Sequence, residues 1–144
     1  ILKNINKLEE SNKKILLVSH PYNTYDFTIG KPIIDYLENL GCTIIYSDLF
    51  DKEKCSMSSK VLSENLYWKY SRDAIGSIEL VPDVDGIIFF STFPCGLDSL
   101  VNELVIRKIH KPCLNLIIDD STSVTGLETR IESFLDILER RNRL

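Results

Sequence analysis

The fold of this chain is indicated most directly by the stretch VDGIIFFSTFPCGLDSL, residues 84–100. Its first part, Val84–Phe90, is a continuous apolar run, which is typical of a strand buried on both faces of a parallel sheet. A proline and a glycine then flank Cys95, and Asp98 and Ser99 have the side chains of a helix cap. The stretch therefore predicts a strand, a tight turn and a helix.

The rest of the chain repeats this alternation. Short apolar runs predict three further strands, over residues 13–20, 42–47 and 111–119. Apolar residues at helical spacing predict helices that begin near Gly30 and end at Gly41, that run from about residue 59 to 79, and that contain Leu100, Val101, Leu104 and Val105. Thr125 and Glu128 have the spacing of a capping box and predict the start of the last helix.

This order of elements predicts an α/β fold. We expect a four-stranded parallel, doubly wound (flavodoxin/Rossmann-like) three-layer sandwich with strand order 2-1-3-4, because right-handed crossovers favour it. Its topological switch point would lie between strands 1 and 3.

Length and composition indicate one ordinary globular domain. The chain has 144 residues, of which 44% are hydrophobic and 26% are charged, and its formal net charge is −4. This negative balance argues against nucleic acid as the main partner. No apolar run reaches the roughly 20 residues of a membrane-spanning helix, so we expect no membrane contact. The four cysteines show no zinc spacing and favour a reducing compartment, and we expect a cytoplasmic protein.

The domain boundaries follow from polarity along the chain. We expect residues 1–12, which are polar, to be a linker or the remnant of a preceding domain. Residues 13–144 would form a single α/β domain. The first residue is not methionine, and we interpret the chain as a fragment of a larger protein.

Ligands of doubly wound folds bind at the carboxyl ends of the strands, and the chain has unusual residues there. These candidates are His20, Tyr22 and Asn23 after strand 1, Cys95, Asp98 and Ser99 after strand 3, and Asp119 after strand 4. His20 is a candidate catalytic residue, as a proton donor or ligand; the alternative is that it caps the end of the strand with a hydrogen bond. Asp119 is a candidate catalytic base or cation ligand; the alternative is that its carboxylate caps the loop.

Cys95 has the strongest physical case. The amino end of a helix favours thiolate over thiol, so Cys95 is a candidate metal ligand, redox thiol or nucleophile, with a space-filling cysteine as the alternative. The dinucleotide-binding and ATP-binding glycine motifs, and the hydrolase elbow, do not occur in the sequence.

Four segments resemble one protein family. They read SHPYNTYD (residues 19–26), NLYWKYSRDAIG (65–76), PDVDGIIFFSTFPCGLDSLVNEL (82–104) and TGLETRIESFLDILERR (125–141). Together they are similar to activase-related proteins of the 2-hydroxyacyl-CoA dehydratase and benzoyl-CoA reductase group. The match is to the dehydratase-subunit-like C-terminal region of a CoA-substrate-specific enzyme activase, and its most specific part is F-P-C-G-x-D-S.

The resemblance implies iron–sulfur chemistry. Such subunits hold a 4Fe-4S cluster with cysteines from more than one domain, and an activase delivers an electron to it after ATP hydrolysis. Cys95 matches the motif cysteine, so the resemblance makes it the candidate metal ligand. Three or four thiolates complete such a site, so neighbouring domains of the full protein would supply the rest, and the isolated fragment would hold a cluster poorly or not at all. The partners implied are other domains of the same chain, namely the ATPase activase modules.

One departure and two alternatives accompany this interpretation. The loop after the last strand reads Asp119-Asp120-Ser121-Thr122, where the family has an acidic residue and a histidine. One alternative is a non-catalytic interaction domain that docks an activase or partner subunit through the 59–79 helix. The other is a flavodoxin-like small-molecule domain in which His20, Asn23 and Ser99 hold a phosphate, with Tyr22 and Asp98 as further candidate binding residues.

Overall fold

The computed structural model of the chain describes residues 12–50, 76–81, 83–93, 96–119 and 121–144. These residues form a four-stranded sheet of β1 (Lys14–Val18), β2 (Thr43–Tyr46), β3 (Gly86–Thr92) and β4 (Cys113–Ile118). All neighbouring strands are parallel and their order is β2-β1-β3-β4, which confirms the predicted topology. The switch point lies between β1 and β3, where Leu17 pairs with Ile88.

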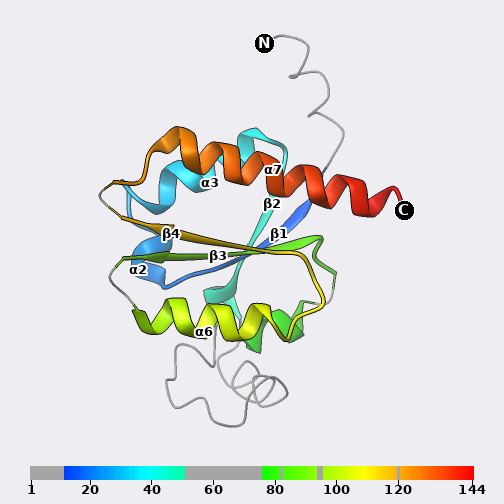
Figure 1. Ribbon diagram of the computed structural model, residues 1–144, viewed down its shortest axis with the longest axis horizontal. Helices are drawn as coiled ribbons and strands as arrows, with labels where there is room; N and C mark the ends of the chain where they lie inside the picture. Colours follow the sequence, from blue (N-terminus) through cyan, green and yellow to red (C-terminus); the bar gives the residue numbers. More distant parts are fainter. Residues whose placement is uncertain (1–11, 51–75, 82, 94–95, 120) are drawn as a thin grey trace.

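Helices cover both faces of the sheet (Figure 1). The helical elements are α2 (Pro21–Thr24), α3 (Gly30–Asn39), the 3₁₀ turn η1 (Ser47–Leu49), α6 (Gly96–Ile106) and α7 (Val124–Asn142). In Figure 1, α3 and α7 lie above the sheet and α6 lies below it. Residues 76–80 are also helical, and the rest of the predicted 59–79 helix lies outside the described residues. Within the described part of the chain, no helix is long and apolar enough to cross a membrane.

The two faces of the sheet have separate apolar cores. Ile15, Leu17, Ile88 and Phe90 point toward α3 and α7, and Leu16, Val18, Ile87 and Phe89 belong to the second core, on the α6 face. All eight are buried, with at most 3% of each exposed. The continuous apolar strands seen in the sequence follow from this burial, because alternate residues meet a helix layer on either side.

Two helices begin at other residues than the sequence predicted, and one short helix was not predicted. α6 begins at Gly96, so Asp98 and Ser99 lie inside its first turn and do not precede it as a cap. α7 begins at Val124, and the Ser123 side chain accepts the N–H of Gly126, so the capping box predicted at Thr125 is wrong. The short helix α2 was not predicted.

The predicted α6 stripe is only half correct. Val101 and Val105 are buried, whereas Leu100 and Leu104 are more than half exposed. The described part of the molecule covers one side of this helix only, so periodicity alone gave the position of the helix but too wide an apolar face.

Candidate functional site

Three loops meet at one edge of the sheet, where Val18, Thr92 and Ile118 end their strands; we call it the carboxyl edge. The Thr92 hydroxyl donates to the Asn23 side-chain oxygen at 3.3 Å, which joins the loop after β1 to the end of β3. The Phe93 N–H donates to the Ile118 carbonyl at 2.8 Å, which joins β3 to the end of β4. The loop after β1 therefore contacts the end of β3, and the chain after β3 contacts the end of β4, as the parallel topology predicts.

α2 shapes the first of these loops. The His20 carbonyl accepts the N–H groups of Asn23 and Thr24 at 2.9 and 3.0 Å, and Pro21 occupies the first helical position, where its missing N–H costs nothing. The half-buried His20 ring stacks on Tyr22 with 4.7 Å between ring centroids. Tyr22 itself is exposed. His20 and Tyr22 therefore lie together at the carboxyl edge.

Asn23 points into the protein. Only 2% of the residue is exposed, and within the described residues its side-chain nitrogen has no hydrogen-bond partner. A buried amide donor without a partner is uncommon in folded proteins. Its oxygen already accepts the hydroxyl of Thr92, so Asn23 connects the two loops beneath the surface.

Asp119 organises the loop after β4. Its carboxylate accepts the Ser121 hydroxyl at 2.7 Å, the Ser121 N–H at 2.9 Å and the Thr122 hydroxyl at 2.8 Å. The hydrogen bonds from Ser121, followed by those from Thr122, hold the pKa of Asp119 below its ordinary value. This arrangement fits the loop-cap role better than that of a general base, because a base must give up such bonds to take a proton.

Asp26 has a similar role before α3. Its carboxylate accepts the N–H and hydroxyl of Thr28 at 2.8 and 2.6 Å and the N–H of Ile29 at 2.9 Å. The bonds from Thr28 lower the pKa of Asp26, and they fix the chain that leads into α3.

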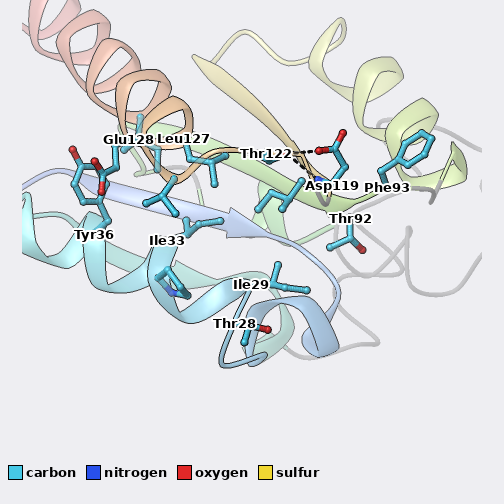
Figure 2. A pocket seen from close by; sticks show the side chains of 14 residues that line it. Thr28, Ile29, Ile33, Tyr36, Thr92, Phe93, Asp119, Thr122, Leu127 and Glu128 are labelled. Carbon is cyan, nitrogen blue, oxygen red and sulfur yellow. Dashed lines mark hydrogen bonds between the residues drawn. The ribbon is translucent and has the colours of Figure 1, made fainter.

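A groove of about 390 Å³ lies between α3 and α7 and extends to the carboxyl edge (Figure 2). Figure 2 shows Tyr36 and Glu128 toward one end, and Thr92, Phe93 and Asp119 toward the other. We call this cavity the α3–α7 groove. Its lining is completed by Thr28, Ile29, Pro32, Ile33, Ile118, Thr122, Val124, Leu127 and Ile131.

Tyr36 joins the two helices beside this groove. Its hydroxyl donates to the Glu132 carboxylate at 2.5 Å. Desolvation, together with the hydrogen bond and charge of Glu132 and the charge of Glu128, raises the pKa of Tyr36. The phenol therefore stays protonated as a hydrogen-bond donor throughout the neutral range. No sequence pattern above indicated this contact, since its partners are 96 residues apart.

Large apolar side chains are exposed around the carboxyl edge. Phe93 follows β3 and is 70% exposed, and Leu49 follows β2 and is 73% exposed. In the loop between β1 and α3, Tyr25 and Phe27 are also mostly exposed. Exposed apolar groups that gather on one surface mark a contact with something else more often than scattered ones do.

The cysteines of the described residues lie away from this edge. Cys42 and Cys113 stand at the starts of β2 and β4, the opposite edge in a parallel sheet. Burial raises the pKa of Cys42, and burial raises that of Cys113 to about 11, so both stay thiols at neutral pH. Cys55 and Cys95 lie outside the described residues.

The described residues do not make a metal site by themselves. Among them, no group of three or more histidine, cysteine or acidic side chains is positioned to hold a metal ion.

Two other predicted residues belong to α6. Ser99 is half-buried in its first turn, and the side chain of Asp98 lies outside the described part. Ser99 does not line the α3–α7 groove, and neither do His20, Tyr22 and Asn23. Asp119 is the one described candidate that does.

Comparison of the chain with protein-family models, with curated proteins and with solved structures gives no match.

Proposed function

We propose that this domain presents Cys95 to a 4Fe-4S cluster in a cleft shared with other domains of a cytoplasmic, activase-related protein of the 2-hydroxyacyl-CoA dehydratase group. The cluster, when bound, would supply low-potential electron transfer coupled to ATP hydrolysis elsewhere in the protein. The sequence resemblance suggests the family. The observation that supports the geometry is the exposed apolar surface at the carboxyl edge.

The apolar surface supports a domain contact at this edge. Phe93 is two residues before Cys95 in the sequence and is 70% exposed. Tyr25 and Phe27 expose further aromatic surface from the neighbouring loop. Aromatic side chains are enriched in the buried centres of protein contacts, and a contact here would exclude water from the sulfur of Cys95.

The described cysteines support the expectation that other domains complete the site. Cys42 and Cys113 stand at the starts of β2 and β4, the edge of the sheet opposite to the carboxyl edge, and burial raises the pKa of both thiols. The family resemblance makes Cys95 the candidate ligand, and in this proposal neighbouring domains supply the remaining ligands.

No observation on the described residues specifically supports either alternative, the docking domain or the phosphate-binding domain. The docking helix predicted over residues 59–79 lies mostly outside the described residues. A phosphate site of His20, Asn23 and Ser99 would need Asn23 at the surface, and that residue is 98% buried in the fold described above.

Anaerobic reconstitution of the full-length protein with iron and sulfide tests the proposal. The wild-type protein is expected to gain visible absorbance and close to four iron atoms per protein. Cys95→Ser should lose most of the iron, and Cys113→Ser, a matched cysteine at the opposite edge, should retain it. Full iron content in Cys95→Ser, with native circular dichroism in both variants, would refute the ligand assignment.

Amide exchange tests the domain contact separately. Residues 20–28 and Phe93 should exchange more slowly in the full-length protein than in the 144-residue chain, because a second domain covers them. Equal exchange in both proteins would remove the structural support for the shared cleft.

A further inference from the structure

We propose that the α3–α7 groove binds a small molecule with an apolar body and a neutral or positively charged head. The proposal does not rest on the role proposed for Cys95, although the groove shares Phe93 with the domain contact proposed above. It uses residues of α3, α7 and the ends of β3 and β4, and neither of the two described cysteines, Cys42 and Cys113, contributes to its lining.

The floor of the groove is apolar and belongs to the core. Ile33 and Ile131 are 97% and 99% buried and come from opposite helices, and Ile118 adds the end of β4. The volume of about 390 Å³ lies within the range of roughly 300–1,000 Å³ that small-molecule pockets occupy. A wholly packed interface between two helices would leave no such space.

The two ends of the groove differ. The hydrogen bond between Tyr36 and Glu132 crosses from α3 to α7 and bridges the helices near one end. Thr92, Phe93 and Thr122 lie at the other end, at the carboxyl edge. A ligand would therefore lie with its long axis between the helices, from Tyr36 toward the carboxyl edge.

The charges select the kind of ligand. Asp119 and Glu128 are the carboxylates of the lining, and among the described lining residues there is no lysine, arginine or histidine. The cations on the neighbouring turns are engaged elsewhere: Lys31 pairs with Asp35 at 3.0 Å, and Arg130 donates to the Asn115 carbonyl at 2.7 Å.

An anionic head would meet two negative charges without a compensating cation, whereas an ammonium or hydroxyl head can donate to Glu128. The hydroxyl groups of Thr28 and Thr92 already donate to Asp26 and Asn23, so their oxygens can only accept a further hydrogen bond, which an ammonium or hydroxyl head can donate. The arrangement therefore disfavours phosphates and carboxylates as ligands of this groove.

Three matched probes test the proposal on the 144-residue chain: 1-naphthylmethylamine, 1-naphthalenemethanol and 1-naphthoate at pH 7. Their apolar bodies are the same, and their heads are cationic, neutral and anionic. Titration is followed by the methyl resonances of Ile33, Leu127 and Ile131. We expect the amine and the alcohol to shift these resonances, and the amine to bind about tenfold more tightly than the naphthoate.

Variants locate the site. Leu127→Phe should fill the groove and weaken binding of the alcohol at least about fivefold. Ile137→Phe, on an exposed position of the same helix, should leave it unchanged. Glu128→Gln should reduce the preference for the amine over the naphthoate while binding of the alcohol stays within about twofold.

The proposal is overturned if no probe shifts the three methyl groups up to its solubility limit, or if naphthoate binds as tightly as the amine. Intermolecular Overhauser contacts between the alcohol and Ile33 in the wild-type chain provide a test that needs no variant. Contacts to other parts of the protein in place of Ile33 would equally refute the site.

Discussion

Replacing Gly30 by alanine tests how the loop after β1 is held at the carboxyl edge. Gly30 is the first residue of α3. A Cβ atom there would lie 2.2 Å from the carbonyl oxygens of both Asn23 and Thr24. Both obstacles are backbone atoms of α2, so no side-chain rotation can relieve them, and α2 or α3 must move.

The expected magnitude is a difference between two opposing effects. Alanine in place of glycine within a helix normally stabilises a protein by up to about 1 kcal/mol. Overpacking of a buried site costs about 1–3 kcal/mol, and we place this site at the upper end or beyond because Asn23 and Thr24 are themselves 98% and 97% buried. The net free energy of unfolding should fall by about 2–3 kcal/mol, which lowers the melting temperature by about 4–12 °C in a domain of this size.

Urea unfolding followed by circular dichroism measures this change, and Gly96→Ala is the matched control. Gly96 is also the first residue of a helix, but a Cβ atom there would have no heavy atom within 4 Å. Gly96→Ala should therefore leave stability unchanged or raise it slightly. If Gly30→Ala is as stable as the wild type, the close approach of α2 to α3 is refuted.

Three further predictions concern stability. Phe134→Ala should cost about 3–5 kcal/mol in urea unfolding, because Phe134 is 96% buried in the core beneath α7, and a loss below 1 kcal/mol would contradict that packing. Because the pKa of Tyr36 is raised in the folded state, the stability that this phenol contributes is present below pH 10, its ordinary pKa, and is lost as the pH rises above 10. Tyr36→Phe should therefore flatten the loss of stability above pH 10. An unchanged alkaline stability profile would refute this. The lowered pKa of Asp26 contributes stability above its ordinary value of 3.8 that is lost as pH falls below it; Asp26→Ala should flatten this acid dependence, and equal acid profiles would argue against the turn at Thr28.

The sequence predicted the architecture because burial on both faces leaves a local mark. Residues 87–90, Ile-Ile-Phe-Phe, are apolar at every position, and each meets one of two helix layers. Such runs alternate with helical periodicity along the chain, and right-handed crossovers then leave few possible strand orders. The sheet order β2-β1-β3-β4 is the result.

Helix starts were predicted less well because several polar residues compete for one cap. Ser123 and Thr125 both have a hydroxyl that can accept a backbone N–H. The path of the chain leaving β4 decides between them, and it favours Ser123. Similarly, α6 begins at Gly96, two residues before the acidic side chain that resembled a cap.

The amino-acid sequence by itself determined the parallel sheet and the edge at which its loops meet, since both follow from periodicity and chain direction. Tertiary structure alone decided that Asn23 is buried and that Tyr36 contacts Glu132 across the α3–α7 groove. These features depend on how closely two helices approach when side chains from distant parts of the chain fill the space between them. Packing distance is not encoded in any local pattern, so only the folded chain reveals the groove.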